Sequence, residues 1–514
     1  MPPERTDAAP MSDPLRWGAL LILGLTAVRL VALFLSPLEL YPDEAQYWLW
    51  SRDLAFGYFS KPPMIAWLIA LTTAIAGDSE AGVRLFAPLL HAGTAFVLMA
   101  VALRLSDRIT AFWAALIYSL MPGVQLSAGL ASTDAALLFF LSLALLAYVE
   151  LDRRQGREAL VAAAGLGAAL GLAFLSKYAA IYFLIGAALH AVLSHGGRAR
   201  WSWARGSVAA GALAVFIAPN LLWNAANDFA TVSHTAANAN LGADLFHPAQ
   251  AAEFVASQLG VFGPVPFVLL IWAMVRAFRR RSEPEIMLAA LTIPPLLIVT
   301  VEAFLSRANA NWAAAAYVPG SVLAALMLVS LARARRWWQG GVALPQGALA
   351  AVFLVAAISP AAADALGLSN SFKRARGWEA ASRLIMDEAR DQGVATIATD
   401  DRFLFNSLAF YERERLALPG APVLRMWVRT GRAATEAERA APLDAGAPGP
   451  VLLASLEGKY APEMQRDFAS TVAPSTARVR LDRKRVRRVE MMIAQGFRPG
   501  PRDAEGKPIP QAAP

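Results

Sequence analysis

Two adjacent acids and a lysine near the N-terminus are the first residues in this chain that could do chemistry. Asp43 and Glu44 follow a long apolar run in "YPDEAQYW", and Lys61 precedes two prolines in "GYFSKPPM". A carboxylate among aromatic residues can act as a general base toward a hydroxyl or amine, and a lysine ammonium suits a phosphate oxygen. Two alternatives stay open: Asp43 is also a good helix N-cap, and Lys61 could be an interfacial lysine that reaches toward headgroups.

Three more charged residues stand beside or within apolar runs. Arg29 lies inside the first run, where a charge is costly, so it is a functional candidate that could pair with Asp43 or Glu44. Asp134, in "GLASTDAALLFF", opens another run and is either a site acid or a helix cap. Arg307, in "SRANANWAAAAY", is the only basic residue of its short loop. The sequence thus offers an acid, a lysine and an arginine for an anionic substrate.

The composition indicates a membrane protein. Of 514 residues, 57% are hydrophobic and 17% are charged, whereas soluble domains carry roughly 25% charged residues. The chain has no cysteine, which excludes disulfides, thiolate zinc sites and thiol catalysis. The net charge is +8, and the basic residues fall mostly between apolar runs, a pattern of membrane topology and not of nucleic-acid binding.

The candidate residues named above must therefore be positioned by membrane-spanning helices. Runs of about 17–25 apolar residues predict an α-helical polytopic fold. We expect eleven spans, with a count between eleven and thirteen. They lie near 15–36, 81–105, 109–125, 132–150, 157–175, 177–194, 206–223, 254–278, 285–305, 311–331 and 342–360.

Loop charges predict the orientation of these spans. Positive residues follow every second span, and residues 224–253 contain no Lys or Arg. Since basic loops stay in the cytoplasm, the N-terminus is expected inside, and the loops 37–80 and 224–253 outside. The basic residues are Arg104 and Arg108; Arg153, Arg154 and Arg157; Arg198, Arg200 and Arg205; Arg276, Arg279, Arg280 and Arg281; Arg333, Arg335 and Arg336.

The predicted domains follow from these patterns. A cytoplasmic tail, 1–14, precedes a transmembrane domain, 15–360, and from residue 361 the composition is that of a soluble α/β domain. "GVATIATD" and "PVLLASL" predict buried strands, and "WEAASRLIMDEARDQG" predicts a helix. This domain, 361–496, is expected on the periplasmic side, followed by a disordered tail, 497–514.

No cofactor is assigned from the sequence. His234, His247 and Glu253 could hold a divalent metal, but their spacing fits no recognised ligand pattern. A divalent metal stays possible without assigned ligands. The chain has no P-loop or Rossmann glycine pattern, so nucleotide binding is not supported.

The ordered motifs resemble a known family. Asp-Glu after the first span, the "YF-x-KPP" pattern, "STDAALLFF", "GLAFLSKYAAIYF" and "NWAAAAY" resemble the GT-C integral-membrane glycosyltransferases. The nearest branch is that of bacterial proteins related to protein O-mannosyltransferases and the lipid A aminoarabinose transferase. The likeness covers roughly residues 15–330. One position departs from the aminoarabinose transferase pattern: Ser60 stands where an acid precedes the lysine, which argues against a metal site there and against identity with that enzyme.

The resemblance implies a role for several residues. Asp43 is the implied catalytic carboxylate, with Asp134 as a second acid, and Glu44 joins them as a candidate. Lys61 is implied to contact the donor phosphate, and Tyr58 to shape the pocket.

The remaining candidates complete that site. Arg84 and Arg307 are candidate donor-phosphate ligands, and Arg29 and Lys177 are candidate pocket residues. Lys177 is one of only two lysines before residue 373.

The implied function is sugar transfer at the outer face of the bacterial cytoplasmic membrane. The donor is a polyprenyl-phosphate sugar, and the acceptor is a lipid, lipopolysaccharide, other polysaccharide or protein, with membrane lipids and no nucleic acid as other partners. The competing hypothesis is a transporter or flippase of a lipid-linked or anionic substrate, in which Arg29, Asp134 and Lys177 are intramembrane relay charges.

Overall fold

The computed structural model describes residues 13–237, 245–430, 433–472, 474–482, 484–500 and 502–503. The predicted N-terminal tail 1–14 lies almost entirely outside these residues, and most of the predicted tail 497–514 does too.

Internal contacts divide the chain into two compact units. The first, called the helical unit, comprises Met1–Leu35, Ala55–Gly77 and Arg84–Ile358. The second, called the sheet unit, comprises Ser36–Leu54, Asp78–Val83 and Ser359–Pro514. Asp43 and Glu44 therefore group with the C-terminal part of the chain, which differs from the domain predicted over 15–360.

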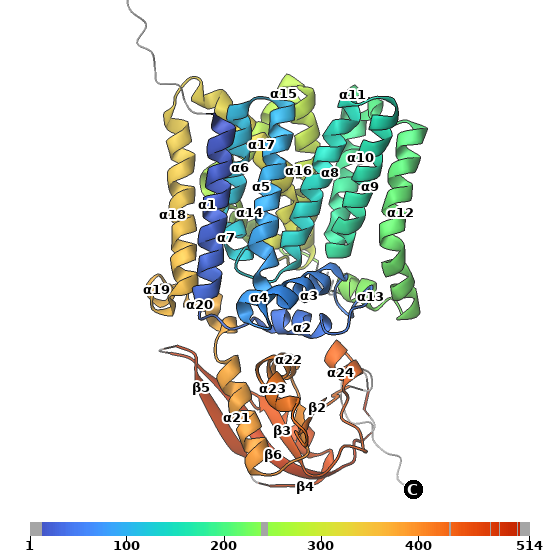
Figure 1. Ribbon diagram of the computed structural model, residues 1–514, viewed down its shortest axis with the longest axis vertical. Coiled ribbons are helices and arrows are strands. Elements are labelled where there is room, and N and C mark those ends of the chain that lie inside the picture. The colour runs from blue at the N-terminus through green and yellow to red at the C-terminus, as the bar shows by residue number, and fades with distance from the viewer. Residues whose placement is uncertain are drawn as a thin grey trace, which may run out of the picture. The chain divides into compact units, whose positions relative to one another are not determined.

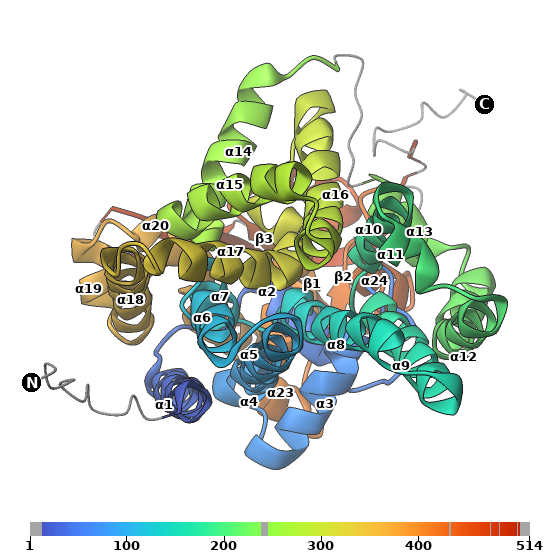
Figure 2. The ribbon, with the colours of Figure 1, turned by 90° about the horizontal axis from the view of Figure 1, so that it is seen from above.

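Within the described residues, eight helical segments are long and apolar enough to cross a membrane. The predicted α-helical polytopic class is confirmed, and the chain is a multi-pass membrane protein whose helices form a bundle (Figures 1 and 2). The segments are Pro14–Leu35 (α1), Glu80–Leu105 (α4, Glu80–Arg84, and α5, Phe86–Leu105), Thr133–Arg153 (α8), Gly156–Ser176 (α9), Trp203–Ala226 (α12), Glu283–Leu305 (α16), Ala310–Ala332 (η2, Ala310–Ala316, and α17, Tyr317–Ala332) and Trp337–Ile358 (α18).

The other three predicted spans are short or broken helices. The segment 109–125 is α6 (Arg108–Ser119) followed by α7 (Pro122–Ser127), and 177–194 is η1 (Tyr178–Ala180) followed by α10 (Ile181–Leu193). The segment 254–278 is a pair, α14 (Pro248–Phe262) and α15 (Pro264–Arg280), bent by 111°. The count of eleven is therefore not confirmed: length and composition support eight spans in the described chain, or nine if the bent pair is one span.

The bend between α14 and α15 has a local cause. Gly263 joins them with φ +98°, a conformation that L-residues with a Cβ rarely adopt. A Cβ at Gly263 would also clash with the Gln346 side chain, whose Nε2 donates to the Phe262 carbonyl at 3.0 Å. Pro264 begins the next helix, where a missing N–H costs nothing.

Shorter helices complete the helical unit. They are α3 (Met64–Ala76), α11 (His195–Ala199) and α13 (Ala230–Ala237). The 13 residues of α3 are too few to cross a hydrocarbon core about 30 Å thick.

The two ends of the helical bundle differ in charge. Arg104 lies in the last turn of α5, Arg153 in that of α8, and Arg279 and Arg280 in that of α15. Figure 1 shows α11 and α15 at this basic end. Asp134 lies in the first turn of α8 and Arg153 in its last turn, so Asp134 lies toward the opposite end of the bundle, called the Asp134 end. The alternation of basic loops along the sequence thus corresponds to one end of the bundle.

The sheet unit is built on a six-stranded sheet of order β2-β1-β3-β6-β4, with β5 paired to β6. β1 is parallel to β2 and β3, whereas β6 is antiparallel to β3, β4 and β5. The strands are β1 (Thr396–Thr399), β2 (Val423–Met426), β3 (Val451–Leu456), β4 (Phe468–Thr471), β5 (Ser475–Arg480) and β6 (Val486–Phe497). The helices are α2 (Pro42–Trp50), α19 (Pro360–Ala365), α20 (Ser369–Phe372), η3 (Lys373–Ala375), α21 (Trp378–Asp391), α22 (Arg402–Tyr411), α23 (Arg413–Leu416), α24 (Glu436–Ala440) and α25 (Ala461–Gln465).

The two predicted strands and the predicted helix are present as β1, β3 and α21. All four residues of β1 are buried, as expected for a central parallel strand covered on both faces. The apolar stripe of α21 includes Ile385 and Ala389, which pack in one core cluster with Ile397 of β1 and Leu452 of β3. The sheet unit is thus a mixed α/β unit with its own hydrophobic core.

Segment 36–54 is held to the rest of the sheet unit by specific contacts. The Leu40 N–H donates to the Tyr411 hydroxyl at 2.7 Å, and Glu39 accepts from the Trp378 N–H. Trp48 of α2 packs edge-on against Phe410 of α22, with ring centroids 5.0 Å apart. These contacts place α2, and with it Asp43, against α22.

Asp400 should make the stability of the sheet unit depend on pH. Burial raises the pKa of this carboxyl to about 6, although it accepts from the Ser455 hydroxyl and, at 3.0 Å, from the Leu456 N–H. Because the folded pKa is raised, protonated Asp400 stabilises the unit below about pH 4, and this stability is lost as pH rises through about 6.

Asp400→Asn mimics the protonated acid. We expect it to match the wild type below pH 4 and to be more stable by up to roughly 2 kcal/mol above pH 7. Hydrogen exchange in β1 and β3 peptides of the full-length protein, corrected for intrinsic rates, measures this difference. Asp391→Asn is the control, because Asp391 is an exposed acid at the end of α21 in the same unit and should change the stability little at either pH. An equal gain at both pH values would contradict the prediction.

Candidate functional site

Asp134 is the centre of a polar cluster in the helical unit. Its Oδ1 accepts from Lys177 Nζ at 2.7 Å, and its Oδ2 accepts from Asn311 Nδ2 at 2.6 Å. The residue is 7% exposed. The N-cap position of α8 belongs to Ser132, so Asp134 is not the helix cap that its sequence context allowed. Its carboxylate instead joins three segments that are far apart in the chain.

Breaks in helical structure bring the partners of Asp134 to it. Lys177 lies between α9 and η1 with an extended backbone, φ −164° and ψ 136°. Its side chain therefore does not follow the helical pattern of α9 and reaches Asp134 instead. Asn311 lies in η2, a 3₁₀ segment before α17. Both irregular segments are at the Asp134 end, and each contributes one donor to the carboxylate.

Lys61 belongs to the surroundings of the same carboxylate. Its positive charge acts on Asp134 together with that of Lys177. The loop before α3 is folded back by a Tyr58 N–H to Lys61 carbonyl bond of 3.1 Å, and Pro63 precedes the first residue of α3. The structure thus brings Lys61, Asp134 and Lys177 of the predicted residues together.

Tyr58 fixes the loop that carries Lys61. It is 6% exposed, its hydroxyl accepts from the Ala55 N–H at 3.0 Å, and its carbonyl accepts from Thr231 Oγ1 at 2.5 Å. Tyr58 therefore stabilises the loop from within, and its predicted contact with a bound substrate stays a prediction.

A second polar network was missed in the sequence. Asn220 Nδ2 donates to the Phe56 carbonyl at 2.6 Å, and Asn220 Oδ1 accepts from the Tyr178 hydroxyl at 3.0 Å. Asn224 Nδ2 donates to the same hydroxyl at 3.2 Å. Since Tyr178 follows Lys177, this network joins the Lys177 segment to the Lys61 loop. Two asparagines four residues apart in an apolar helix are the signal that could have revealed it.

The three predicted arginines lie in different surroundings. Arg307 is exposed in the loop before η2, four residues ahead of Asn311, and Arg84 is 2% exposed at the end of α4. Arg29 is 6% exposed. Its Nη2 donates to the Ser119 carbonyl at 2.6 Å and to Gln125 Oε1 at 2.9 Å. Its partners are thus neutral oxygens of the α6–α7 region, which corrects the predicted pairing with Asp43 or Glu44.

Asp43 and Glu44 have different tasks in the sheet unit. Glu44 is 2% exposed, and its Oε2 accepts from the Tyr41 N–H at 2.8 Å, at the N-terminus of α2. The Asp43 side chain is 43% exposed and lies 3.9 Å from Arg374 Nη2 and 3.7 Å from Arg402 Nη2. The capping role that the sequence allowed for Asp43 therefore belongs to Glu44. The catalytic role predicted for Glu44 stays a prediction.

Metal candidates were also compared with the structure. Within the described residues, no three His, Cys, Asp or Glu side chains lie close enough to hold a metal ion. His234 lies beside Phe59, with ring centroids 5.8 Å apart, and the His247 N–H donates to the Phe304 carbonyl. The group of His234, His247 and Glu253 is thus not gathered into a metal site.

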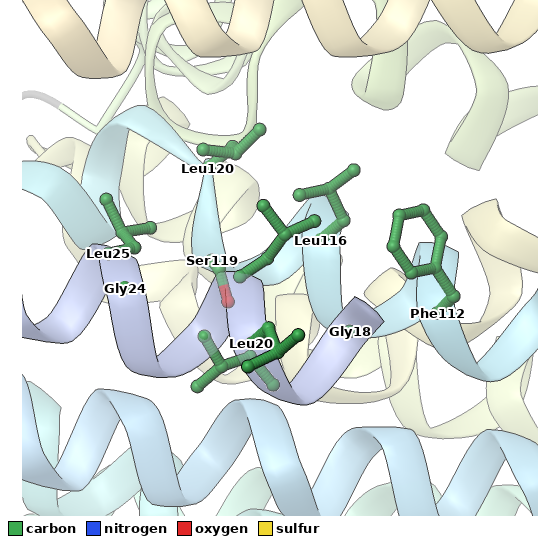
Figure 3. Close-up of a pocket in the computed structure, with 10 residues that line it drawn as sticks. Gly18, Leu20, Gly24, Leu25, Phe112, Leu116, Ser119 and Leu120 are labelled. Atoms are coloured by element: carbon green, nitrogen blue, oxygen red, sulfur yellow. The ribbon is translucent and has the colours of Figure 1, made fainter. Parts of the chain in front are cut away.

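The cavity between α1 and α6 is separate from these clusters. It measures about 280 Å³ and is lined by residues such as Leu20, Leu116 and Phe112 (Figure 3). Ser119 is its one hydroxyl-bearing lining residue. An apolar cavity of this kind can take acyl chains but offers no group for acid–base chemistry.

Comparisons with known proteins agree with this fold. Residues 60–223 match the family model of dolichyl-phosphate-mannose-protein mannosyltransferase. The apo crystal structure of ArnT from Cupriavidus metallidurans superimposes with a TM-score of 0.65 and 17% identity, over 94% of this chain and 98% of ArnT. The likeness to ArnT shows a shared fold, and the family-model match agrees with the resemblance to the GT-C integral-membrane glycosyltransferases that the sequence motifs indicated.

Two named relatives share part of their sequence with the chain. The lipid A galacturonosyltransferase RgtD of Rhizobium johnstonii is 40% identical over 296 residues, 57% of this chain and 61% of RgtD. An undecaprenyl phosphate-alpha-4-amino-4-deoxy-L-arabinose arabinosyl transferase of Pseudomonas fluorescens is 31% identical over 180 residues, 32% of this chain and 30% of that enzyme. The chain thus spans less than two thirds of either relative.

The Asp134–Lys177 pair should show strong energetic coupling. Lys177→Met leaves a carboxylate without its cation in a site where Asp134 is 7% exposed, so we expect a loss of roughly 3 kcal/mol in stability. Asp134→Asn/Lys177→Met removes both charges and should recover much of that loss. Chemical unfolding in detergent measures the stability of Lys177→Met, of Asp134→Asn and of the double variant. Additive losses would show that the two charges do not interact.

Proposed function

We propose that the protein transfers a sugar from a polyprenyl-phosphate carrier to a lipid A-type acceptor at the outer face of the bacterial cytoplasmic membrane. The observation that carries this proposal is the charge cluster at the Asp134 end, where Lys61 and Lys177 act on one buried carboxylate. Two cations at the end of a membrane bundle suit the phosphate of a lipid-linked donor. The names of the two relatives support the lipid A acceptor and the undecaprenyl phosphate carrier.

The reaction assigns a separate task to each group. The acceptor hydroxyl oxygen bonds to the anomeric carbon, and the bond from that carbon to the carrier phosphate breaks through an oxocarbenium-like state. Asp43 takes the hydroxyl proton as general base. Lys61 stabilises the charge on the departing polyprenyl phosphate, and Asp134 acts as a positioning residue that holds Lys177 and Asn311.

Asp43 is suited to this task by its surroundings. Glu44 satisfies the N-terminus of α2, so the Asp43 carboxylate stays accessible at 43% exposure. Arg374 and Arg402 lie 3.7–3.9 Å from it and can hold the side chain in position. The structural alternative is that Asp43 only neutralises these arginines.

Asp43→Asn separates the two roles. It keeps the size of the side chain and removes the basic oxygen, so the transfer rate should fall by roughly two to four orders of magnitude if Asp43 is the base. The assay uses purified protein, polyprenyl-phosphate sugar and lipid A, with release of carrier phosphate and gain in acceptor mass as readouts. Near-normal turnover would assign Asp43 to the structural role.

Glu44→Gln is the matched control. Its amide oxygen can still accept from the Tyr41 N–H, so α2 should keep its cap and the transfer rate should change little.

Movement of the intact donor across the membrane without sugar transfer by the wild type would instead favour the transporter hypothesis.

The orientation of the sheet unit is part of the proposal. Basic loops at one end of the bundle support a cytoplasmic location for that end, so the C-terminal part is expected in the periplasm. A protease site inserted at Gly420, in an exposed turn before β2, should be cut by protease added to spheroplasts. Cleavage only after lysis would reverse the orientation.

A further inference from the structure

Positive charge is concentrated in the hairpin of the sheet unit formed by β5 and β6. Residues 475–490 include seven basic and two acidic residues, a net charge of +5 in a chain whose net charge is +8. One of the seven, Arg483, lies outside the described residues. The strands pair antiparallel from Ser475 opposite Met491 to Arg480 opposite Val486.

The hairpin has a buried and an exposed face. Ala477, Val479 and Val489 are buried in the same core cluster as Trp378 of α21, and the Arg487 guanidinium lies 3.2 Å from the centre of the Trp378 ring. Strand alternation turns the next residues to the opposite face. The contact with Trp378 therefore accounts for the arginine at position 487, whereas packing on the buried face does not account for the arginines on the exposed face.

The exposed face brings like charges together. Arg478 of β5 stands directly opposite Arg488 of β6, and like charges opposite each other destabilise a strand pair. Arg480 and Lys484 are also exposed nearby in the chain. The facing pair of Arg478 and Arg488 thus lowers the stability of the folded hairpin instead of contributing to it.

Acidic neighbours neutralise only part of this charge. Arg488 Nε lies 3.4 Å from Glu457, and Arg485 Nε lies 3.0 Å from Asp482. Arg480 donates to the Asp482 backbone carbonyl at 3.2 Å, which leaves its charge in place. Among the residues that the structure describes, Arg478 has no ion-pair partner.

Chain connectivity ties the hairpin to the membrane. Arg485 Nη1 donates to Asn370 Oδ1 at 3.3 Å, and Asn370 follows Ile358, the last residue of the span α18, by twelve positions. This short connection to a spanning helix makes the anionic groups of a bilayer surface the first anions to test as partners of the hairpin.

We propose that the β5–β6 hairpin binds phosphate-bearing lipid headgroups through Arg478, Arg480 and Lys484. Arginine binds phosphate oxygens with a planar, bidentate fork, and a phosphate between Arg478 and Arg488 offsets their repulsion. The phosphate comes from an anionic phospholipid or from a phosphorylated glycolipid acceptor. This binding does not depend on sugar transfer, and its test needs no donor.

The experiment measures the acetylation rate of Lys484 in the full-length protein by mass spectrometry. The protein is placed in nanodiscs of phosphatidylcholine, of phosphatidylcholine with phosphatidylglycerol, or of phosphatidylcholine with diphosphoryl lipid A. We expect labelling to be slower by about fivefold in at least one anionic disc than in the neutral disc. Protection by phosphatidylglycerol assigns the phospholipid, and protection by diphosphoryl lipid A alone assigns the glycolipid.

A charge-matched pair of variants completes the test. Arg478→Glu/Arg480→Glu should label at the neutral-disc rate in every disc. Arg390→Glu/Arg466→Glu changes two exposed arginines outside the hairpin by the same charge and should behave as the wild type. Equal labelling of the wild type in all three discs overturns the proposal, and so does protection that survives Arg478→Glu/Arg480→Glu.

Discussion

A carboxylate buried at the end of a membrane bundle must find a cation and hydrogen-bond donors, and Asp134 imposes this requirement on the helical unit. Lys177 and Asn311 meet it at 2.7 and 2.6 Å. Each donor sits where a regular helix is interrupted: Lys177 has an extended backbone after α9, and Asn311 lies in the 3₁₀ segment before α17. The interruptions before α10 and α17 are therefore part of the same arrangement as the ion pair.

The neutral network around Tyr178 extends this arrangement to the Lys61 loop. Asn220 binds both Tyr178 and the Phe56 carbonyl, so the chain before Lys61 and the chain after Lys177 share one partner. Amide side chains are suited to this because each can donate and accept at once. The backbone segments that carry Lys61 and Lys177 are thus joined by uncharged groups, while the Lys177 ammonium itself pairs with Asp134.

The sequence predicted the kinds of residues in these clusters better than their connections. Lys61, Asp134 and Lys177 stand out because charges and lysines are rare in this apolar chain. Asn311 and Asn220 do not, since a single amide in an apolar run is common and its partner lies up to 177 positions away. The sequence favoured Asp43 over Glu44 as the catalytic carboxylate, but it did not reveal which acid caps α2, because adjacent acids at a helix start look alike until one of them binds the Tyr41 N–H.

The sequence by itself determined the class of the protein: apolar runs of spanning length, basic loops after every second run and an α/β pattern after residue 361. These properties are local and can be read from composition and period. Only the tertiary structure decided where helices break, that α2 groups with the sheet unit, and which carboxylate caps and which stays open. Such outcomes depend on partners distant in the chain, such as Gln346 beside Gly263 and Tyr411 at Leu40, and no local pattern carries that information.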